Sequence, residues 1–146
     1  ILGFIKELAA YERLADRVVA TESGLAATLF GPRPYAEAIL AIADGVPVGF
    51  ALFFHNYSTF LGRPGVYLED LFVRESARGL GVGKALLARV ARVAVERECG
   101  RMEWAVLDWN RPAIGFYTRL GAEALDDWTG FRLTGSALDA VANLAR

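Results

Sequence analysis

Cysteine, histidine and methionine each occur only once in the 146 residues, and 16 basic residues nearly balance 17 acidic ones, for a net charge of −1. The single cysteine, Cys99, excludes a disulfide within the chain and a zinc site built on several cysteines. A near-neutral chain lacks the basic excess that attracts nucleic acid or an anionic membrane. The apolar runs are much shorter than a membrane span, and no segment is typical of a signal peptide. The sequence therefore predicts a soluble cytoplasmic protein that binds a small molecule, without metal, nucleic acid or membrane as partner.

Hydrophobic residues make up 54% of the chain, which is sufficient for one core, so we expect a single domain over residues 1–146. A mean hydropathy of +0.30 is high for a soluble monomer of this size, and from it we expect apolar surface to be buried in a homodimer. The chain begins at Ile1 rather than methionine and already within a predicted helix. We therefore expect that an N-terminal element, the first strand of the sheet, is lacking.

The first half of the chain is predicted to form two helices followed by three strands. Apolar residues at helical spacing predict a helix from residue 2 to about Leu14, and Thr21 is a typical cap for a second helix, which the Gly-Pro-Arg-Pro run at 31–34 ends. The segments 36–43 and 46–54 are joined by Asp-Gly, which readily takes the positive φ angles of a tight turn, so they predict a β-hairpin. A third strand, 66–73, follows a predicted loop at 56–65.

The second half is predicted to alternate helices and strands. Residues 82–97 have the strongest amphipathic helix pattern, and the apolar run 102–107 predicts a buried strand. Asn110 and Pro112 are typical of a helix start, and Gly121 ends that helix. Residues 129–133 predict a last strand, and Ser136 caps a short C-terminal helix. The order of elements indicates an α/β (α+β) fold with a mixed central sheet and helices on both faces.

A glycine-rich loop, residues 78–84 (RGLGVGK), separates the predicted strand 66–73 from the helix that follows. A backbone without side chains lets N–H groups converge on an anion, and the helix start adds the positive end of its dipole, so the loop predicts a pyrophosphate site. A Walker loop is excluded because Lys84 is followed by Ala85, and a dinucleotide fingerprint because Lys84 stands where its third glycine belongs. A glycine-rich turn that only starts a helix is the plain alternative.

This loop matches the R-x-x-G-x-G pattern of the GCN5-related N-acetyltransferases (GNAT) in sequence and context. The segments 5–12 (IKELAAYE), 67–73 (YLEDLFV) and 108–110 (DWN) further resemble the diamine acetyltransferase branch, closest in motifs to thialysine N-epsilon-acetyltransferases. The resemblance implies acetyl-CoA as cosubstrate and direct attack by an amine in a ternary complex. It implies that acetyl-CoA is held by Leu71, Phe72, Val73, Arg78, Gly79, Leu80, Gly81, Val82, Gly83, Lys84, Asn110, Pro112, Ala113 and Tyr117.

Two catalytic residues follow from the same resemblance. Glu69 is the candidate to bind the substrate ammonium or take its proton, directly or through water; a buried carboxylate paired with an arginine is the alternative. Tyr117 lies two helical turns after Asn110 and is the candidate general acid for the leaving thiolate, with a packed tyrosine beside Phe116 as alternative. Strand alternation puts Glu69 and Asp70 on opposite faces unless a bulge intervenes.

The resemblance assigns the amine site to Tyr11, Glu12, Glu69, Asp70 and Trp104. Where polyamine acetyltransferases of this branch carry further carboxylates, this chain has Ser58 and Thr129, which favours a lysine-like amino acid or a diamine over a long polyamine. A spermidine/spermine acetyltransferase and a catalytically silent acyl-CoA-binding module are the alternatives. His55, without a second ligand or nucleophile beside it, is expected to be an ordinary surface residue.

Overall fold

The computed structural model describes residues 1–145, which form two compact units, Ile1–Leu107 and the segment that begins at Asp108. The expected single domain over residues 1–146 stays a prediction. The first unit contains three α-helices and all four strands. The second contains two helices, α4 (Arg111–Arg119) and α5 (Gly135–Ala142). Within the described residues, no helix combines the length and apolarity needed to cross a membrane.

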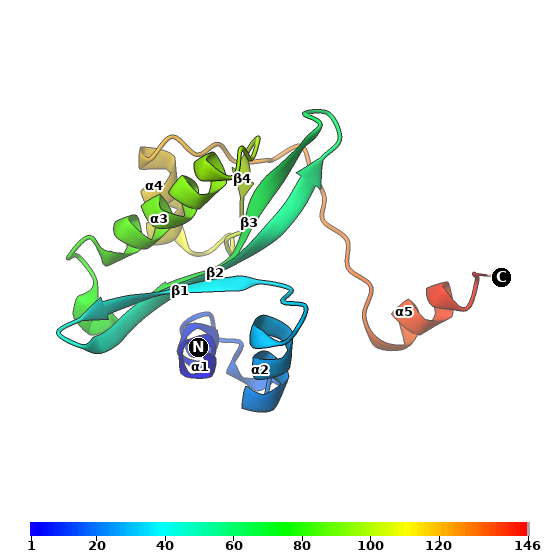
Figure 1. The fold of residues 1–146 in the computed structure, drawn as a ribbon, viewed down its shortest axis with the longest axis horizontal. Helices are drawn as coiled ribbons and strands as arrows, with labels where there is room; N and C mark the ends of the chain where they lie inside the picture. The colour runs from blue at the N-terminus through cyan, green and yellow to red at the C-terminus, as the bar shows by residue number, and fades with distance from the viewer. Residues whose placement is uncertain (146) are drawn as a thin grey trace. The chain divides into compact units, whose positions relative to one another are not determined.

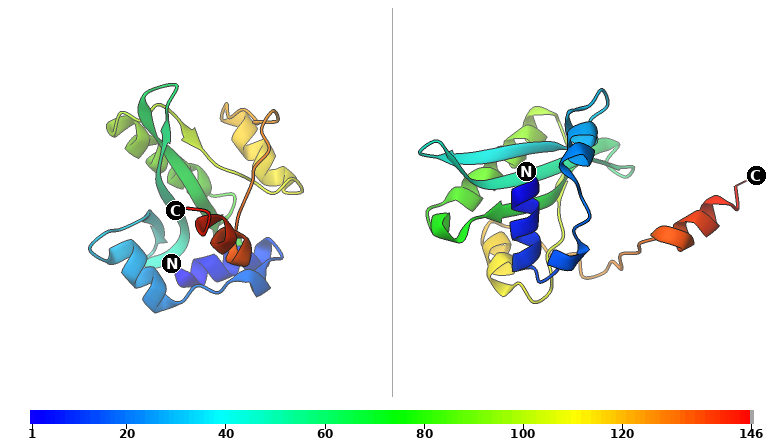
Figure 2. Two further views of the ribbon diagram at one scale, coloured as in Figure 1. Left: turned by 90° about the vertical axis from the view of Figure 1, so that its right-hand side faces the viewer. Right: turned by 90° about the horizontal axis from the view of Figure 1, so that it is seen from below.

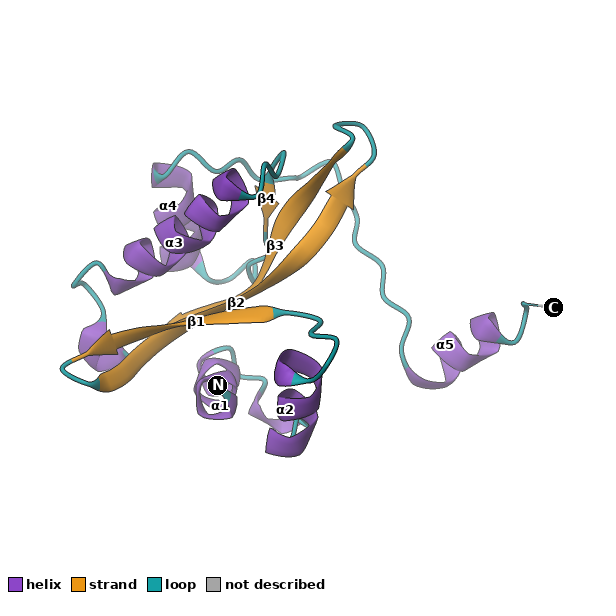
Figure 3. Cartoon of the chain, viewed as in Figure 1, coloured by secondary structure: helices purple, strands orange, loops and turns teal. Residues whose placement is uncertain are grey.

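The first unit is built on a four-stranded mixed sheet (Figures 1 and 3). Its strands, in spatial order, are β1 (Glu37–Ala43), β2 (Val46–Ser58), β3 (Arg63–Val73) and β4 (Met102–Glu103). The first three run antiparallel, whereas β4 is parallel to β3. Helices α1 (Leu2–Tyr11) and α2 (Glu22–Phe30) lie on one face of the sheet, and α3 (Val82–Glu96) lies on the other (Figures 1 and 2). The predicted α/β architecture with helices on both faces is confirmed.

Each face of the sheet is covered by an apolar helix face. On one face, Phe4 of α1 stacks on Phe50 of β2 with ring centroids 5.4 Å apart, in a cluster that also contains Phe72 of β3. On the other face, α3 packs against β2 and β3, and its Val90 is fully buried. The strands are therefore buried on both sides, which explains why β2 has a run of consecutive buried residues rather than an alternating pattern.

Several local predictions are confirmed by the backbone. Asp44 and Gly45 have φ angles of 49° and 79°, as a tight hairpin turn requires. The side chain of Thr21 accepts a hydrogen bond from the amide of Gly24 at 3.1 Å and caps α2. Asn110 caps α4 in the same way. Each of these signals depends only on residues adjacent in sequence.

Helix α1 ends at Tyr11, earlier than the predicted Leu14. The reason is a left-handed residue, Arg13, with a φ of 61°. The amide of Arg13 bonds to the carbonyl of Ala10 at 3.1 Å, and the amide of Leu14 bonds to that of Ala9 at 2.8 Å, which is the Schellman pattern of a helix end. Glu12 is therefore the C-cap residue of α1.

Other predicted boundaries were wrong where pairing between strands decides them. Strands β2 and β3 pair as far as Ser58 and Arg63, so most of the predicted loop 56–65 is strand. The predicted strand 102–107 pairs with β3 only over Met102–Glu103. No strand forms at 129–133, where the side chain of Phe131 is 95% exposed. The predicted cap at Ser136 is also wrong, because α5 begins at Gly135 without a side-chain cap.

The stacked pair Phe4–Phe50 predicts a large stability loss on truncation of Phe50, which is 0% exposed. Phe50→Ala should lower the free energy of unfolding by about 3–5 kcal/mol, because it removes buried apolar area and leaves a cavity. The matched control is Phe60→Ala, since Phe60 is 100% exposed and its truncation should cost less than about 0.5 kcal/mol. Urea denaturation measures both, and equal effects would contradict the described core.

Candidate active site

The glycine-rich loop lies between a short 3-10 turn, Glu75–Ala77, and the start of α3. Gly79 and Gly81 have φ angles of 77° and 82°, and a Cβ added to either would meet no atom within 4 Å. Gly81 occupies the N-cap position of α3, where no side chain caps the helix and the first turn holds no acidic residue. The first amides of a helix lack intrahelical partners, so this loop presents main-chain donors and a positive dipole end to open space. These features fit a bound phosphate or pyrophosphate.

Not all three glycines of the loop have the same role. Gly83 already lies inside α3, and a Cβ there would make only an ordinary contact of 3.7 Å with Cγ2 of Val73. The backbone therefore requires glycine at Gly79 and Gly81 but not at Gly83. Two cationic residues flank the loop, as predicted, and the exposed Lys84 lies in the first turn of the helix.

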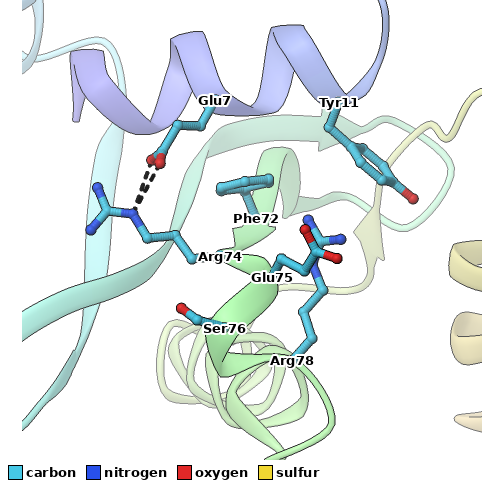
Figure 4. A pocket seen from close by; sticks show the side chains of 7 residues that line it. All are labelled: Glu7, Tyr11, Phe72, Arg74, Glu75, Ser76 and Arg78. Atoms are coloured by element: carbon cyan, nitrogen blue, oxygen red, sulfur yellow. Dashed lines mark hydrogen bonds and ion pairs between the residues drawn. The ribbon is translucent and has the colours of Figure 1, made fainter.

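The side chain of Arg78 extends away from the loop into an open groove of about 670 Å³ (Figure 4). Its guanidinium lies 4.9 Å from the ring centroid of Tyr11 and 5.6 Å from that of Phe72, and its Nε donates to the carbonyl of Val73 at 2.8 Å. The structure thus brings one predicted amine-site residue together with three predicted cofactor residues. The groove is lined by Glu7, Tyr11, Phe72, Arg74, Glu75, Ser76 and Arg78.

A second arginine of the groove is already paired. The Nε of Arg74 is 3.1 Å from both carboxylate oxygens of Glu7 on α1 (Figure 4). Its Nη1 donates to the carbonyl of Pro47 at 2.9 Å. By contrast, none of the ion pairs among the described residues involves Arg78. Arg74 therefore joins α1 to the sheet, whereas the charge of Arg78 is available to the groove.

Strand β3 contains the bulge on which the placement of Glu69 and Asp70 depends. Leu52 of β2 pairs with Asp70, and the next residue, Phe53, pairs with Leu68, so Glu69 has no partner in the ladder. The extra residue resets the alternation of side chains along β3. Asp70 consequently shares the α1 face with Leu52, and Glu69 and Asp70 are not forced onto opposite faces.

At this bulge, the charges of two further carboxylates, one on β3 and one at the end of α1, act on Asp70. Asp70 is half-buried, and burial raises its pKa to about 6 from the ordinary 3.8, with the charges of Glu69 and then Glu12 adding to the shift. Burial also raises the pKa of Glu12, at the end of α1. Like charges in a partly desolvated place favour either a bound cation or a shared proton. The cluster of Glu12, Glu69 and Asp70 is therefore suited to bind an ammonium group.

The edge of β3 beyond the bulge is the segment predicted to bind the thioester end of acetyl-CoA. Strand β4 pairs with β3 only at Val66 and Tyr67, directly before the bulge. The segment Leu71 to Val73 pairs with β2 on its other edge. Among the described residues, β4 is thus not paired with this segment, and Trp104, the first residue after β4, is half-buried.

The second unit holds the predicted residues of α4. Asn110 is 8% exposed, and its Oδ1 accepts a hydrogen bond from the amide of Ala113 at 3.4 Å. Pro112 lies in the first turn of the helix. The ring of Tyr117 is half-buried and 5.2 Å from that of Phe116. The structure thus contains the helix cap at Asn110 and the ring contact of Tyr117 with Phe116 that the sequence predicted.

One cluster was missed by sequence reasoning. His55, predicted to have no nucleophile beside it, lies with Nδ1 3.8 Å from Sγ of Cys99 and 3.0 Å from the carbonyl of Gly65, and with Nε2 2.9 Å from Nη1 of Arg97. Arg97 also pairs with Glu37, whose pKa is lowered by that hydrogen bond. The sequence offered no signal for the contact between His55 and Cys99. It depends on β2 running alongside the C-terminal end of α3, which the local sequence does not encode. Among residues 1–145, no group of three or more histidine, cysteine, aspartate or glutamate side chains is arranged to hold a metal ion.

The fold and these features define a class of protein. A loop with bare main-chain donors, which fits a pyrophosphate, follows β3, and carboxylates suited to a cation lie at the bulge of the same strand. An acetyl-CoA-dependent amine acetyltransferase needs both, because its two substrates are a polyanion and an ammonium.

Comparison with known proteins agrees with this class. Residues 7–122 match the model of the Acetyltransferase (GNAT) family. The chain is 40% identical over 149 residues to a thialysine N-epsilon-acetyltransferase of Bos taurus, covering 94% of the chain and 87% of the relative. It is 38% identical over 185 residues to an L-ornithine N5-acetyltransferase of Arabidopsis thaliana, covering 96% and 81%. An integron cassette protein from the mobile metagenome of V. cholerae has a similar solved structure, with a TM-score of 0.80, 29% identity and coverage of 96% and 88%. The chain belongs to the GNAT family and is an N-acetyltransferase acting on amines, with acetyl-CoA as the cosubstrate of that family.

The glycine-rich loop predicts a specific effect of Gly81→Asp. A carboxylate and a Cβ at Gly81 would occupy the space where the backbone must approach phosphate, so affinity for acetyl-CoA should fall by about tenfold or more. The matched control is Gly45→Asp in the hairpin turn, because Gly45 has a φ of 79° against 82° for Gly81 and equally open surroundings. Both variants should lose similar stability, but only Gly81→Asp should lose affinity in calorimetry. Unchanged affinity in Gly81→Asp would remove the assignment of the loop.

Proposed function

We propose that this acetyltransferase acetylates the terminal primary amine of a lysine-like amino acid, such as thialysine or ornithine, by direct attack on acetyl-CoA. The carboxylates Glu12, Glu69 and Asp70 at the β3 bulge carry the proposal, because their combined negative charge suits an ammonium group. Arg78 in the adjoining groove takes part in none of the ion pairs among the described residues, and its charge suits an amine that also bears a carboxylate. The names of the similar Bos taurus and Arabidopsis thaliana enzymes give the same substrate class.

In this proposal, main-chain groups bind the pyrophosphate and the thioester, whereas side chains bind the amine and transfer protons. The loop from Arg78 to Lys84 would hold the pyrophosphate, and the edge from Leu71 to Val73 would direct its N–H groups at the thioester carbonyl. Asn110, Pro112 and Ala113 of α4 would contact pantetheine. Acetyl-CoA supplies the acetyl group and a thiolate leaving group. Tyr11, Glu12, Asp70 and Trp104 would line the amine site, with Glu69 attracting the ammonium or taking its proton and Tyr117 protonating the leaving sulfur.

A long polyamine is the second candidate, and Ser58 argues against it. Ser58 is 4% exposed, and its Oγ accepts a hydrogen bond from the amide of Leu61 at 3.2 Å within the β2–β3 turn. This position therefore contributes to the turn rather than offering a charge to a distant amine. A catalytically silent acyl-CoA-binding module is the third candidate, and the retention of Glu69 and Tyr117 disfavours it. The homodimer and the cytoplasmic location stay predictions.

An amine panel separates these candidates. Purified protein with acetyl-CoA is incubated with ornithine, thialysine, putrescine or spermidine, and release of free thiol is measured. Putrescine is ornithine without its carboxylate, so this pair isolates the contribution of that group. We expect kcat/KM to be at least about tenfold higher for ornithine and thialysine than for putrescine or spermidine, corresponding to one charge-assisted contact of about 1.4 kcal/mol. Spermidine as the best substrate would establish the polyamine alternative, and no turnover of any amine would establish the silent module.

The role of Tyr117 gives a separate prediction. Tyr117→Phe keeps the ring that packs beside Phe116 but removes the hydroxyl, so kcat should fall by about 10²- to 10⁴-fold with little change in acetyl-CoA affinity. Tyr35→Phe is the control, because the side chain of Tyr35 is 71% exposed and its hydroxyl has no proposed role. A thioester with a more acidic leaving thiol should reduce the deficit of Tyr117→Phe. Turnover within a few-fold of the parent would show that Tyr117 only packs.

A further inference from the structure

Two charged side chains of the groove take part in none of the ion pairs among the described residues. Glu75 is the first residue of the 3-10 turn after β3, and Arg78 directly follows that turn. Both side chains extend from the turn toward α1 (Figure 4). The other two charged residues of the groove, Arg74 and Glu7, are paired with each other. The groove therefore presents one positive and one negative charge to a molecule that binds in it.

The guanidinium of Arg78 is oriented by three contacts. Its Nε donates to the carbonyl of Val73 at 2.8 Å, and it lies 4.9 Å and 5.6 Å from the ring centroids of Tyr11 and Phe72. Within the described residues, no protein acceptor binds its two terminal nitrogens. Together these nitrogens form the fork that matches the two oxygens of a carboxylate. Arg78 is thus oriented to receive a carboxylate before the ligand binds.

We propose that this groove binds the amino-acid head group of the substrate, with Arg78 on its α-carboxylate and Glu75 on its α-ammonium. This inference rests on the proposed function, since it requires an amino acid whose terminal amine is acetylated. The side chain of Arg78 then determines which amine is used, whereas its backbone belongs to the loop that holds the pyrophosphate.

The spacing between the groove and the carboxylates at the bulge fits such a substrate. Asp70 and Phe72 lie on the same face of β3 two residues apart, which is roughly 6–7 Å along a strand. On α1, Tyr11 lines the groove, and the charge of the next residue, Glu12, acts on Asp70. The terminal nitrogen and the carboxylate carbon of extended ornithine are about 6 Å apart, from the lengths of the bonds between them. The terminal ammonium therefore reaches the bulge while the head group contacts Arg78.

The two charges of the groove together select a zwitterion. A polyanion beside Arg78 would be repelled by the charge of Glu75, and a diamine would place a second ammonium beside Arg78. The α-carboxylate and α-ammonium of an amino acid satisfy both charges at once. The pyrophosphate does not need this arginine side chain, because the loop supplies main-chain donors and Lys84 in the first turn of α3 supplies a cation.

The test combines enzyme variants with matched amines, and kcat/KM is measured by release of free thiol. Ornithine is compared with putrescine, which lacks the carboxylate, and with δ-aminovalerate, which lacks the α-ammonium. Arg78→Gln should lower kcat/KM for ornithine by about 10- to 100-fold, mainly through KM, and for putrescine by less than about threefold. Glu75→Gln should lower kcat/KM for ornithine by about three- to fivefold and leave that for δ-aminovalerate unchanged.

The matched control is Arg92→Gln, because Arg92 is an exposed arginine of α3 that does not line the groove. It should leave kcat/KM for all three amines within about twofold of the parent. Acetyl-CoA affinity, measured by calorimetry, should stay within a few-fold of the parent in every variant. Thermal denaturation should show that all variants fold, since the replaced side chains are exposed.

The outcomes separate the subsite from the proposed function. A parent preference for ornithine over putrescine that persists in Arg78→Gln would overturn the subsite and leave the proposed function in place. Equal losses for ornithine and putrescine in Arg78→Gln, or acetyl-CoA affinity at least about tenfold weaker, would overturn it by assigning the side chain to the cofactor. Equal losses for ornithine and δ-aminovalerate in Glu75→Gln would overturn the role of Glu75. Spermidine as the best substrate of the parent would overturn the proposed function itself.

Discussion

The extra residue in β3 at Glu69 determines which face of the sheet each later side chain of that strand occupies. If β3 paired with β2 without it, Asp70 would lie opposite Ala51, which is fully buried on the face that carries α3. A carboxylate there would be desolvated among apolar side chains without compensation. Phe72 would also leave its place opposite Phe50 in the cluster under α1. The bulge therefore serves the core and the site together: it keeps the aromatic residue inside and turns the carboxylate toward α1.

Strand β3 and the loop after it provide one region that attracts anions and another that attracts cations. Near its end, the chain turns through the 3-10 segment into the start of α3, where glycines leave the main-chain donors bare. At the bulge, a few residues earlier, the side chains are acidic. The helix start attracts anions and the cluster attracts cations, so a polyanionic acyl carrier and an ammonium can bind along one strand without competing for the same groups. Arg78 lies between the two regions, with its backbone in the loop and its guanidinium against Tyr11.

Local signals in the sequence were sufficient for turns, caps and helix positions, but not for features that depend on pairing. Asp44 and Gly45 adopt the expected turn because the required φ angles are a property of those two residues. The lengths of β2 and β3, and the brevity of β4, depend on which partners lie alongside, which periodicity does not encode. The same holds for the site. Glu69 and Asp70 were both predicted, yet the burial of Asp70 follows from the register, and the contact of His55 with Cys99 from the length of β2.

The structure of the β2–β3 turn limits which charged side chains can stand at Ser58. Ser58 is the last residue of β2 to pair, and its buried hydroxyl accepts the amide of Leu61, which turns the chain back toward Arg63. A glutamate or aspartate at Ser58 would have to bury a charge or break this bond, and either change costs stability. A carboxylate for a distant amine therefore cannot be added at this position while the turn keeps its present form. The buried hydroxyl of Ser58 and the geometry of the turn therefore depend on each other.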